Sequence, residues 1–140
     1  MVNKILTKDN TGIYSDKVDD IDGAGVVVDD GAYNAGTFKD REYDVRGFKS
    51  FSIDVENIGA NSVDAIVEAS TKDFSDIAAD LDDADYNVEL KAEIAVTATS
   101  RVALIDETWT TPRFTAVRLR CKETVGGSPG TIRGDIKGAR

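Results

Sequence analysis

Apolar and polar residues alternate in short segments along most of this sequence, and a period of two is typical of β-strands with one buried and one solvated face. The clearest case is residues 51–56, where FSIDVE places Phe, Ile and Val on the same face. After turn residues Gly59 and Asn61, the alternation resumes in residues 63–69. Together these segments predict an antiparallel hairpin over residues 48–71.

Further segments of the same kind extend this pattern over the chain. They are residues 26–28, 41–45, 94–98, 102–104, 117–122 and 132–136. Nineteen of the 26 acidic residues are Asp, which favours turns and caps over helix interiors. Seven or eight short strands at this spacing predict an all-β fold, either an antiparallel β-sandwich of the jelly-roll or Ig-like kind or a closed barrel.

Two segments depart from the strand pattern. Residues 74–85 place Phe74, Ile77 and Leu81 at helical spacing, which indicates either one short helix or a strand end followed by an acidic loop. The first 22 residues scatter their apolar side chains among polar ones. Because 140 residues suit one ordinary domain, we expect an N-terminal arm or edge strand over residues 1–22 and a single β-sandwich domain over residues 23–140.

The composition excludes several kinds of chemistry. The sequence has no histidine and one cysteine, Cys121, so it lacks the residues for Ser-His-Asp triads, Cys-His dyads and imidazole–thiolate zinc sites. Cys121 alternates with basic residues and is interpreted as a small core residue. We therefore expect no catalytic residues, no cofactor and no metal site. Without a long apolar run or an N-terminal apolar stretch, neither a membrane span nor Sec-type export is expected.

The charge is distributed unevenly along the chain. The net charge is −9, which argues against nucleic acid or an anionic membrane as the partner. Residues 112–140 nevertheless carry seven basic and two acidic side chains. Residues 117–122 predict a strand with one apolar face and one basic face, the latter formed by Arg118, Arg120 and Lys122. Such a bipolar chain either pairs its two regions within one fold or offers unlike patches to other proteins; the intrachain alternative is favoured.

Several short motifs have both a functional and a structural interpretation. A calcium loop starting at Asp80 would need a glycine where Asp85 stands and a glutamate where Lys91 stands, so the acidic run is interpreted as a solvated loop. Residues 133–135 spell Arg-Gly-Asp inside an alternating segment, and residues 126–130 form a glycine-rich hairpin loop without a phosphate-binding lysine. Trp109 is a candidate sugar-stacking residue, although packing beside a strand is the preferred interpretation.

The central hairpin and one later segment resemble a known group of proteins. Residues 43–77, YDVRGFKSFSIDVENIGANSVDAIVEASTKDFSDI, and residues 108–122, TWTTPRFTAVRLRCK, resemble the small β-sandwich virion structural proteins of tailed viruses. The shared pattern is a strand with a Gly-Phe start, an Asn-x-Gly turn, a second strand ending in Ser-Thr, an acidic-aromatic step and a late Arg-rich strand. This resemblance implies a non-enzymatic capsid decoration or cement protein that sits on the major capsid shell, commonly as a trimer.

The expected partners and location follow from this resemblance. The partner would be the major capsid protein or another virion subunit, and the chain would be made in the host cytoplasm and reside on the capsid surface. Arg113, Arg118, Arg120 and Lys122 are the candidate protein-interaction residues, or the N-terminal arm docks instead, with the acidic loop of residues 73–93 pointing outward. Two alternatives remain: a tail or head-completion subunit, and a carbohydrate-binding or adhesion β-sandwich.

Overall fold

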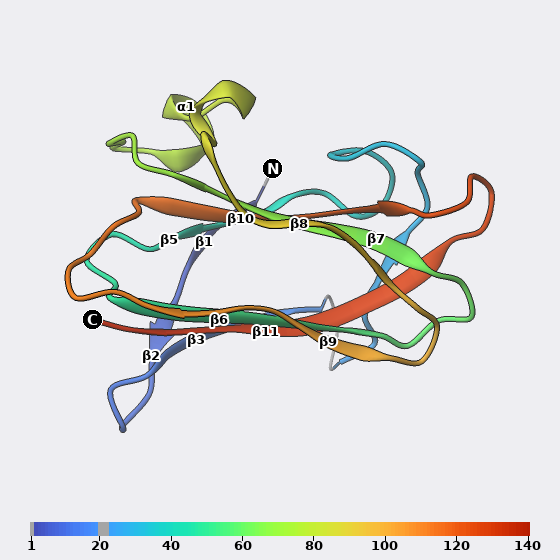
Figure 1. The fold of residues 1–140 in the computed structure, drawn as a ribbon, viewed down its shortest axis with the longest axis horizontal. Helices are drawn as coiled ribbons and strands as arrows, with labels where there is room; N and C mark the ends of the chain where they lie inside the picture. Colours follow the sequence, from blue (N-terminus) through green and yellow to red (C-terminus); the bar gives the residue numbers. More distant parts are fainter. Residues whose placement is uncertain (1, 20–22) are drawn as a thin grey trace.

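Two packed β-sheets form the protein in a computed structural model, which describes residues 2–19 and 23–140. Sheet A has the strand order β1 (Val2–Ile5), β5 (Arg41–Asp44), β10 (Ala116–Glu123), β7 (Val63–Ser70) and β8 (Val88–Val96). Sheet B has the order β2 (Thr7–Lys8), β3 (Tyr14–Val18), β11 (Gly130–Ala139), β6 (Ser50–Asn57) and β9 (Arg101–Thr108), and β4 (Val26–Val28) also pairs with β11. The two layers are seen edge-on in Figure 1. The predicted all-β sandwich is confirmed.

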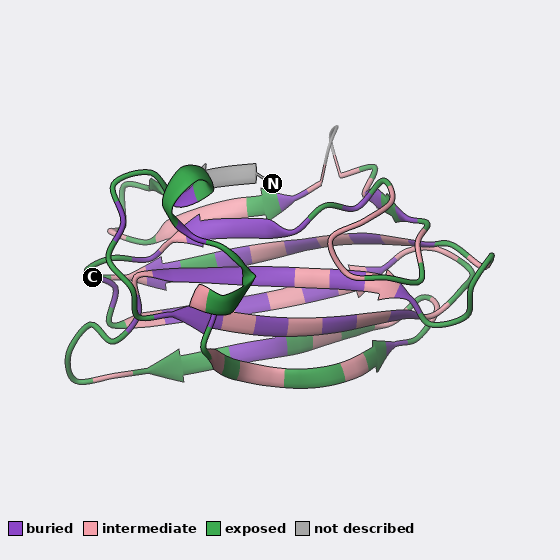
Figure 2. Cartoon of the chain, turned by 90° about the horizontal axis from the view of Figure 1, so that it is seen from above, coloured by how far each residue is buried: buried purple, intermediate pink, exposed green. Residues whose placement is uncertain are grey.

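The core lies between the sheets because the inward faces of the alternating strands are apolar. Residues of β6 alternate between buried and half-buried, and those of β7 follow the same rule, as the bands along the central strands in Figure 2 show. Ile53 and Val55 of β6 face Val63 and Val67 of β7 in a single cluster, all fully buried. Each such side chain contributes roughly 1.5–3 kcal/mol through removal from water. Cys121 is also buried in this cluster, as predicted.

The predicted hairpin joins the two layers instead of lying within one. β6 belongs to sheet B and β7 to sheet A, so the turn at residues 58–62 carries the chain across the sandwich. The following hairpin, β8 and β9, crosses back in the same way and places both strands at sheet edges. The register of β8 against β7 shifts twice, and that of β9 against β6 shifts once. Such bulges interrupt the flat edge that would otherwise pair with another chain.

The structure has eleven strands among the described residues, against the seven or eight expected. The additional three are β1, β2 and β3, all within the segment predicted to be an arm or edge strand. β1 pairs in parallel with β5, and after the buried Leu6 the chain passes to β2 in the opposite sheet. Met1 and residues 20–22 of that segment lie outside the described residues.

A short helical segment covers the outer face of sheet A. It contains α1 (Ile77–Asp80) and the 3₁₀ turn η1 (Asp83–Asp85), which we call together the acidic cap, residues 73–87. Phe74, Ile77, Leu81 and Tyr86 form a second hydrophobic cluster with Ala116 beneath it. Of the two alternatives for residues 74–85, the short helix is therefore observed. Among the described residues, no helix has the length and apolar character needed to span a membrane.

Candidate functional site

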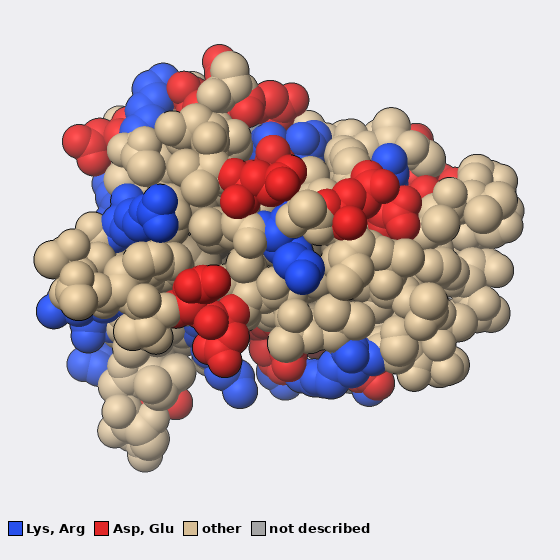
Figure 3. All heavy atoms as spheres, in the orientation of Figure 1, with Lys and Arg blue, Asp and Glu red and all other residues tan. Residues whose placement is uncertain are grey.

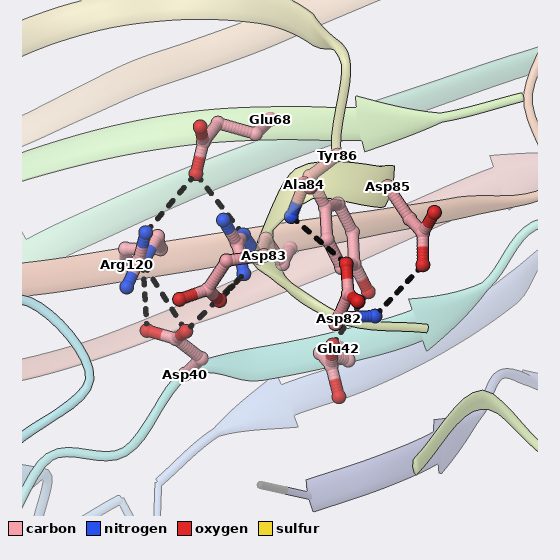
Figure 4. A network of polar contacts seen from close by, with 10 residues as sticks. Asp40, Glu42, Glu68, Asp82, Asp83, Ala84, Asp85, Tyr86 and Arg120 are labelled. Carbon is pink, nitrogen blue, oxygen red and sulfur yellow. Dashed lines mark hydrogen bonds and ion pairs between the residues drawn. The ribbon is translucent and has the colours of Figure 1, made fainter. Parts of the chain in front are cut away.

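The predicted basic face of β10 lies on the outer side of sheet A. Val117, Leu119 and Cys121 face the core, so the alternation of the strand directs Arg118, Arg120 and Lys122 outward, with Arg118 under the acidic cap. Acidic residues from three other parts of the chain converge on Arg118 and Arg120. Figure 4 shows this network of polar contacts.

Arg118 is at the centre of the network and its side chain is only 1% exposed. Its Nε donates to Oε1 of Glu68 on β7 at 3.0 Å, and one terminal nitrogen donates to Oδ1 of Asp83 in the acidic cap at 2.7 Å. The guanidinium also lies 4.1 Å from the ring centroid of Tyr86. Asp83 thereby fixes the cap to the sheet, and Arg118 lowers the pKa of its carboxyl group.

Arg120 extends the network to the loop before β5. Its Nε donates to Oδ1 of Asp40 at 3.1 Å, and Asp40 is fully buried. A terminal nitrogen of Arg120 also lies 3.6 Å from Oε1 of Glu68, so this carboxylate is shared by both arginines. Burial raises the pKa of Asp40, and the two guanidinium groups partly offset this effect.

Glu42 is the second fully buried carboxylate on this face. The Tyr86 hydroxyl donates to its Oε1 at 2.6 Å, while Oε2 has no hydrogen-bond partner within the described part of the chain. Burial raises the pKa of Glu42 more than the Tyr86 hydroxyl and Arg118 lower it. The site therefore holds more carboxylates than guanidinium groups, and burial raises the pKa of two of them, Asp40 and Glu42.

Lys122 and Arg113 lie outside this buried group. The Lys122 ammonium is 3.1 Å from Oε2 of Glu93 on β8 and 4.8 Å from the ring centroid of Tyr33, whose hydroxyl also donates to Glu93. Arg113 is exposed in the loop before β10, and its guanidinium lies 4.9 Å from the Phe114 ring centroid. Of the four predicted interaction residues, three are therefore gathered on one strand and the fourth lies apart.

The pairing of basic and acidic regions within the chain is confirmed by these contacts. Most carboxylates of the acidic loop face solvent, as expected, but residues 73–87 fold back over the basic face of β10, where Asp83 binds Arg118. The physical reason is the apolar underside of the cap: Ile77 and Leu81 are buried only if the segment lies on the sheet. In the edge-on view of Figure 3, acidic and basic side chains are interleaved over the surface.

The carboxylates of the acidic cap serve its local structure. Oδ2 of Asp80 accepts hydrogen bonds from the backbone N–H groups of Ser75 and Asp76, and Asp82 and Asp85 form a capping box around η1. No cluster of three or more potential metal ligands occurs among the described residues. The acidic run is thus a folded segment with capping carboxylates, most of which are exposed to solvent.

The Arg-Gly-Asp sequence, the glycine-rich loop and Trp109 are all parts of the β-sandwich framework. Arg133, Gly134 and Asp135 lie within β11 between β3 and β6, where Arg133 pairs with Glu56 and Asp135 with Arg101. Residues 126–130 connect β10 and β11. The Trp109 ring is half-buried and packs against Phe51 and Phe114, with centroids 4.9 and 5.2 Å apart, which confirms the packing interpretation.

The outer face of sheet B is a feature that the sequence did not indicate. At one end Arg101 binds Asp54 and Asp135 across three strands, beside a polar hollow of about 180 Å³. At the other end a larger hollow of about 300 Å³ lies over β6, β9 and β11. Its lining residues come from three strands and one hairpin tip, so only the strand order, which sequence alternation does not give, brings them together.

Comparisons with known proteins give one distant structural likeness. No protein-family model matches the sequence, and no curated protein matches it. The structure of infectious bursal disease virus, Gx strain, contains a chain similar to this one with a TM-score of 0.43 and 12% identity, covering 89% of this chain and 31% of that chain. This chain therefore spans about a third of the length of the one it matches.

Proposed function

We propose that this chain is a non-enzymatic structural protein of a tailed-virus particle, and more specifically a decoration protein that binds and stabilises the major capsid shell. It would be made in the host cytoplasm and reside on the capsid surface as a trimer. The supporting observation is that the two segments that carry the resemblance lie side by side in the fold. The two segments that carry the resemblance are far apart in sequence, yet β10 pairs with β7 from Ala116 to Glu123 and with β5 on its other side.

Under this proposal the four candidate interaction residues would have different roles. Arg113 is exposed and Lys122 is about a quarter exposed, so these two would contact the shell directly. Arg118 and Arg120 are buried or nearly so and would act by holding the acidic cap in place. A docking surface of this kind is pre-formed, which lowers the conformational entropy lost on binding.

The experiment is co-sedimentation of the purified chain with shells assembled from the major capsid protein of the same genome, preceded by light scattering of the chain alone. A trimer that sediments at a fixed ratio to the shell protein supports the proposal. A chain that ignores shells but forms rings or binds tail proteins would instead indicate a tail or head-completion subunit.

Two variants separate the proposed contacts. Arg113→Ala should weaken shell binding without changing stability, because its side chain is exposed. Deleting residues 1–5 tests docking by the N-terminal segment. This deletion is preferable to removal of residues 1–22, which would also remove β3 and leave one edge of β11 unpaired. Unchanged shell occupancy by both variants would rule out these two contacts.

A further inference from the structure

The larger hollow on sheet B has a regular construction. Lys137, Ser52 and Asp106 lie opposite one another on β11, β6 and β9. In the next row Ala139, Ser50 and Thr108 are paired in the same way. Because neighbouring strands are spaced about 4.8 Å apart, the outer members of each row are separated by about 10 Å. The two serines in the middle, with Lys137 on one side and Asp106 and Thr108 on the other, leave the depression of about 300 Å³, and Ile13 from the β2–β3 hairpin lies on its border.

The polar side chains around this hollow are not used by the fold. Among the described residues, Ser50, Ser52, Asp106, Thr108 and Lys137 make no side-chain hydrogen bond or ion pair, and all five line the hollow. The same sheet face a few residues away is different: Arg101 binds Asp54 and Asp135, and Arg133 binds Glu56. At one end of the face the charged side chains pair with one another, whereas at the other end the polar side chains can bond to a ligand.

The chemistry of the lining restricts the ligand. Three hydroxyl groups both donate and accept hydrogen bonds, the Asp106 carboxylate only accepts, and the Lys137 ammonium only donates. The two charges cancel, so a ligand with a single net charge would meet one like charge. A neutral molecule with several hydroxyl groups satisfies every group at once. Ile13, whose side chain is 37% exposed, adds an apolar wall for the C–H face of such a molecule.

We propose that this hollow binds one sugar residue, the terminal unit of a glycan chain. Asp106 accepts from two neighbouring sugar hydroxyls, Lys137 donates to a third, and Ser50, Ser52 and Thr108 complete the contacts. A volume of about 300 Å³ lies at the lower end for ligand pockets and suits a single ring. This site is independent of shell binding, so either proposal can fail without the other.

The test is titration of the isotope-labelled chain with methyl glycosides of glucose, galactose, mannose, N-acetylglucosamine and rhamnose, observed by backbone amide NMR. Methyl glycosides mimic a terminal unit because the anomeric position is blocked. We expect at least one of them to shift amide signals of residues 50–52, 106–108 and 137–139 selectively, with millimolar affinity. The absence of selective shifts with all five would overturn the proposal. Larger shifts of the same signals by free glycine would overturn it as well, because they would indicate a zwitterion site.

Variants connect the shifts to the proposed contacts. Asp106→Asn and Lys137→Gln should each weaken glycoside binding about tenfold or more, since each removes a hydrogen bond to a charged group. Glu107→Gln is the matched control for the first, because it is exposed on the same strand outside the hollow. Lys17→Gln is the control for the second, on the same sheet face but in the smaller hollow. Equal losses in variants and controls would refute the assignment.

Discussion

Arg118 is the residue on which the outer face of sheet A depends most. Its guanidinium, 1% exposed, compensates carboxylates from β7, the acidic cap and the loop before β5. Removal of one partner from a buried ionic group leaves the opposite charges without compensation, which is more costly than the pair itself is stabilising. Arg118→Ala should therefore lower the free energy of unfolding by about 3–5 kcal/mol, measured by urea denaturation.

Two companion variants test the cause of that loss. Arg118→Lys keeps the charge but loses the planar contact with Tyr86 and the simultaneous bonds to Glu68 and Asp83, so a smaller loss is expected. Arg113→Ala removes an exposed arginine and should change stability by no more than about 0.5 kcal/mol. If Arg113→Ala lowered the free energy of unfolding as much as Arg118→Ala, the loss of a positive charge, and not the burial of Arg118, would explain the destabilisation.

Glu42 should make stability depend on pH in an unusual direction. Burial raises the pKa of its carboxyl group in the folded state above the ordinary value of 4.5. The native chain then binds this proton more tightly than the unfolded chain, so the contribution is full below the unfolded pKa and is lost as pH rises through the folded pKa. Glu42→Gln should stabilise the protein above that range and be nearly neutral in acid.

The control for this prediction is a carboxyl group with the opposite shift. Arg118 lowers the pKa of Asp83, so the stability from Asp83 is present above its unfolded pKa and lost as pH falls through the folded one. Asp83→Asn should therefore destabilise the protein at neutral pH and lose its effect in acid. Urea denaturation of both variants across the acidic range gives the two slopes, and slopes of the same sign would contradict the assignment.

For single residues, the sequence predicts which face of a strand a side chain lies on, but not which residues it contacts. The alternation in residues 117–122 correctly placed Val117 and Leu119 in the core and Arg118 on the opposite face. It did not show that Arg118 is buried, because its partner Glu68 is 50 residues away and Asp83 is 35 residues away. Such contacts depend on strand order, which a single sequence pattern does not specify.

At the scale of elements, β11 shows why a strand in the middle of a sheet contains glycine. Gly134 is buried and lies opposite Val55, and a Cβ atom there would collide with the Asp54 carbonyl oxygen and lie 3.1 Å from the Val55 Cα. Gly134→Ala should destabilise the protein by about 1–3 kcal/mol through this overpacking. Thermal and urea unfolding would measure the loss.

Gly126→Ala is the matched control for that variant. A Cβ atom at Gly126 meets nothing within 4 Å, and its backbone is not in the left-handed region. Its unfolding free energy should stay within about 0.5 kcal/mol of the parent value. If the two variants behave alike, close packing is not the reason for the glycine in β11. The glycine of the Arg-Gly-Asp sequence thus has a packing role, independent of any receptor.

The elements themselves were predictable to different degrees. The strands of residues 51–56, 63–69 and 117–122 follow from their period of two, and all three are strands in the structure. Residues 2–18 gave no comparable signal because β1 and β2 are short strands at sheet edges. β8 begins at Val88 instead of Ile94, since its edge position leaves both faces partly exposed and blurs the alternation.

For the whole molecule, the edge at β8 controls self-association. Lys91 lies opposite Val67, whose side chain is in the core, and register shifts interrupt the pairing on both sides of this position. A charge at such an edge position opposes pairing with a second chain. Lys91→Val should therefore produce dimers or larger species beyond those of the parent protein, measured by sedimentation velocity at several concentrations.

Lys39→Val is the control, because it makes the same change of charge at an exposed residue outside any strand. It should leave the sedimentation profile unchanged. Association of both variants to the same extent would show that the loss of a positive charge from an acidic chain, and not the sheet edge, is responsible.

The strand order also determines when this protein can fold during its synthesis. The strands at the centre of the two sheets, β10 and β11, follow all the others in sequence. Until the ribosome has released both, β5 has no link to β7, and β3 has none to β6. Before that point the nascent chain can form only separate strand groups, with β1 on β5, β2 on β3, and β6 to β9 packed as a partial sandwich. The complete sandwich therefore forms late, when β10 and β11 join these groups.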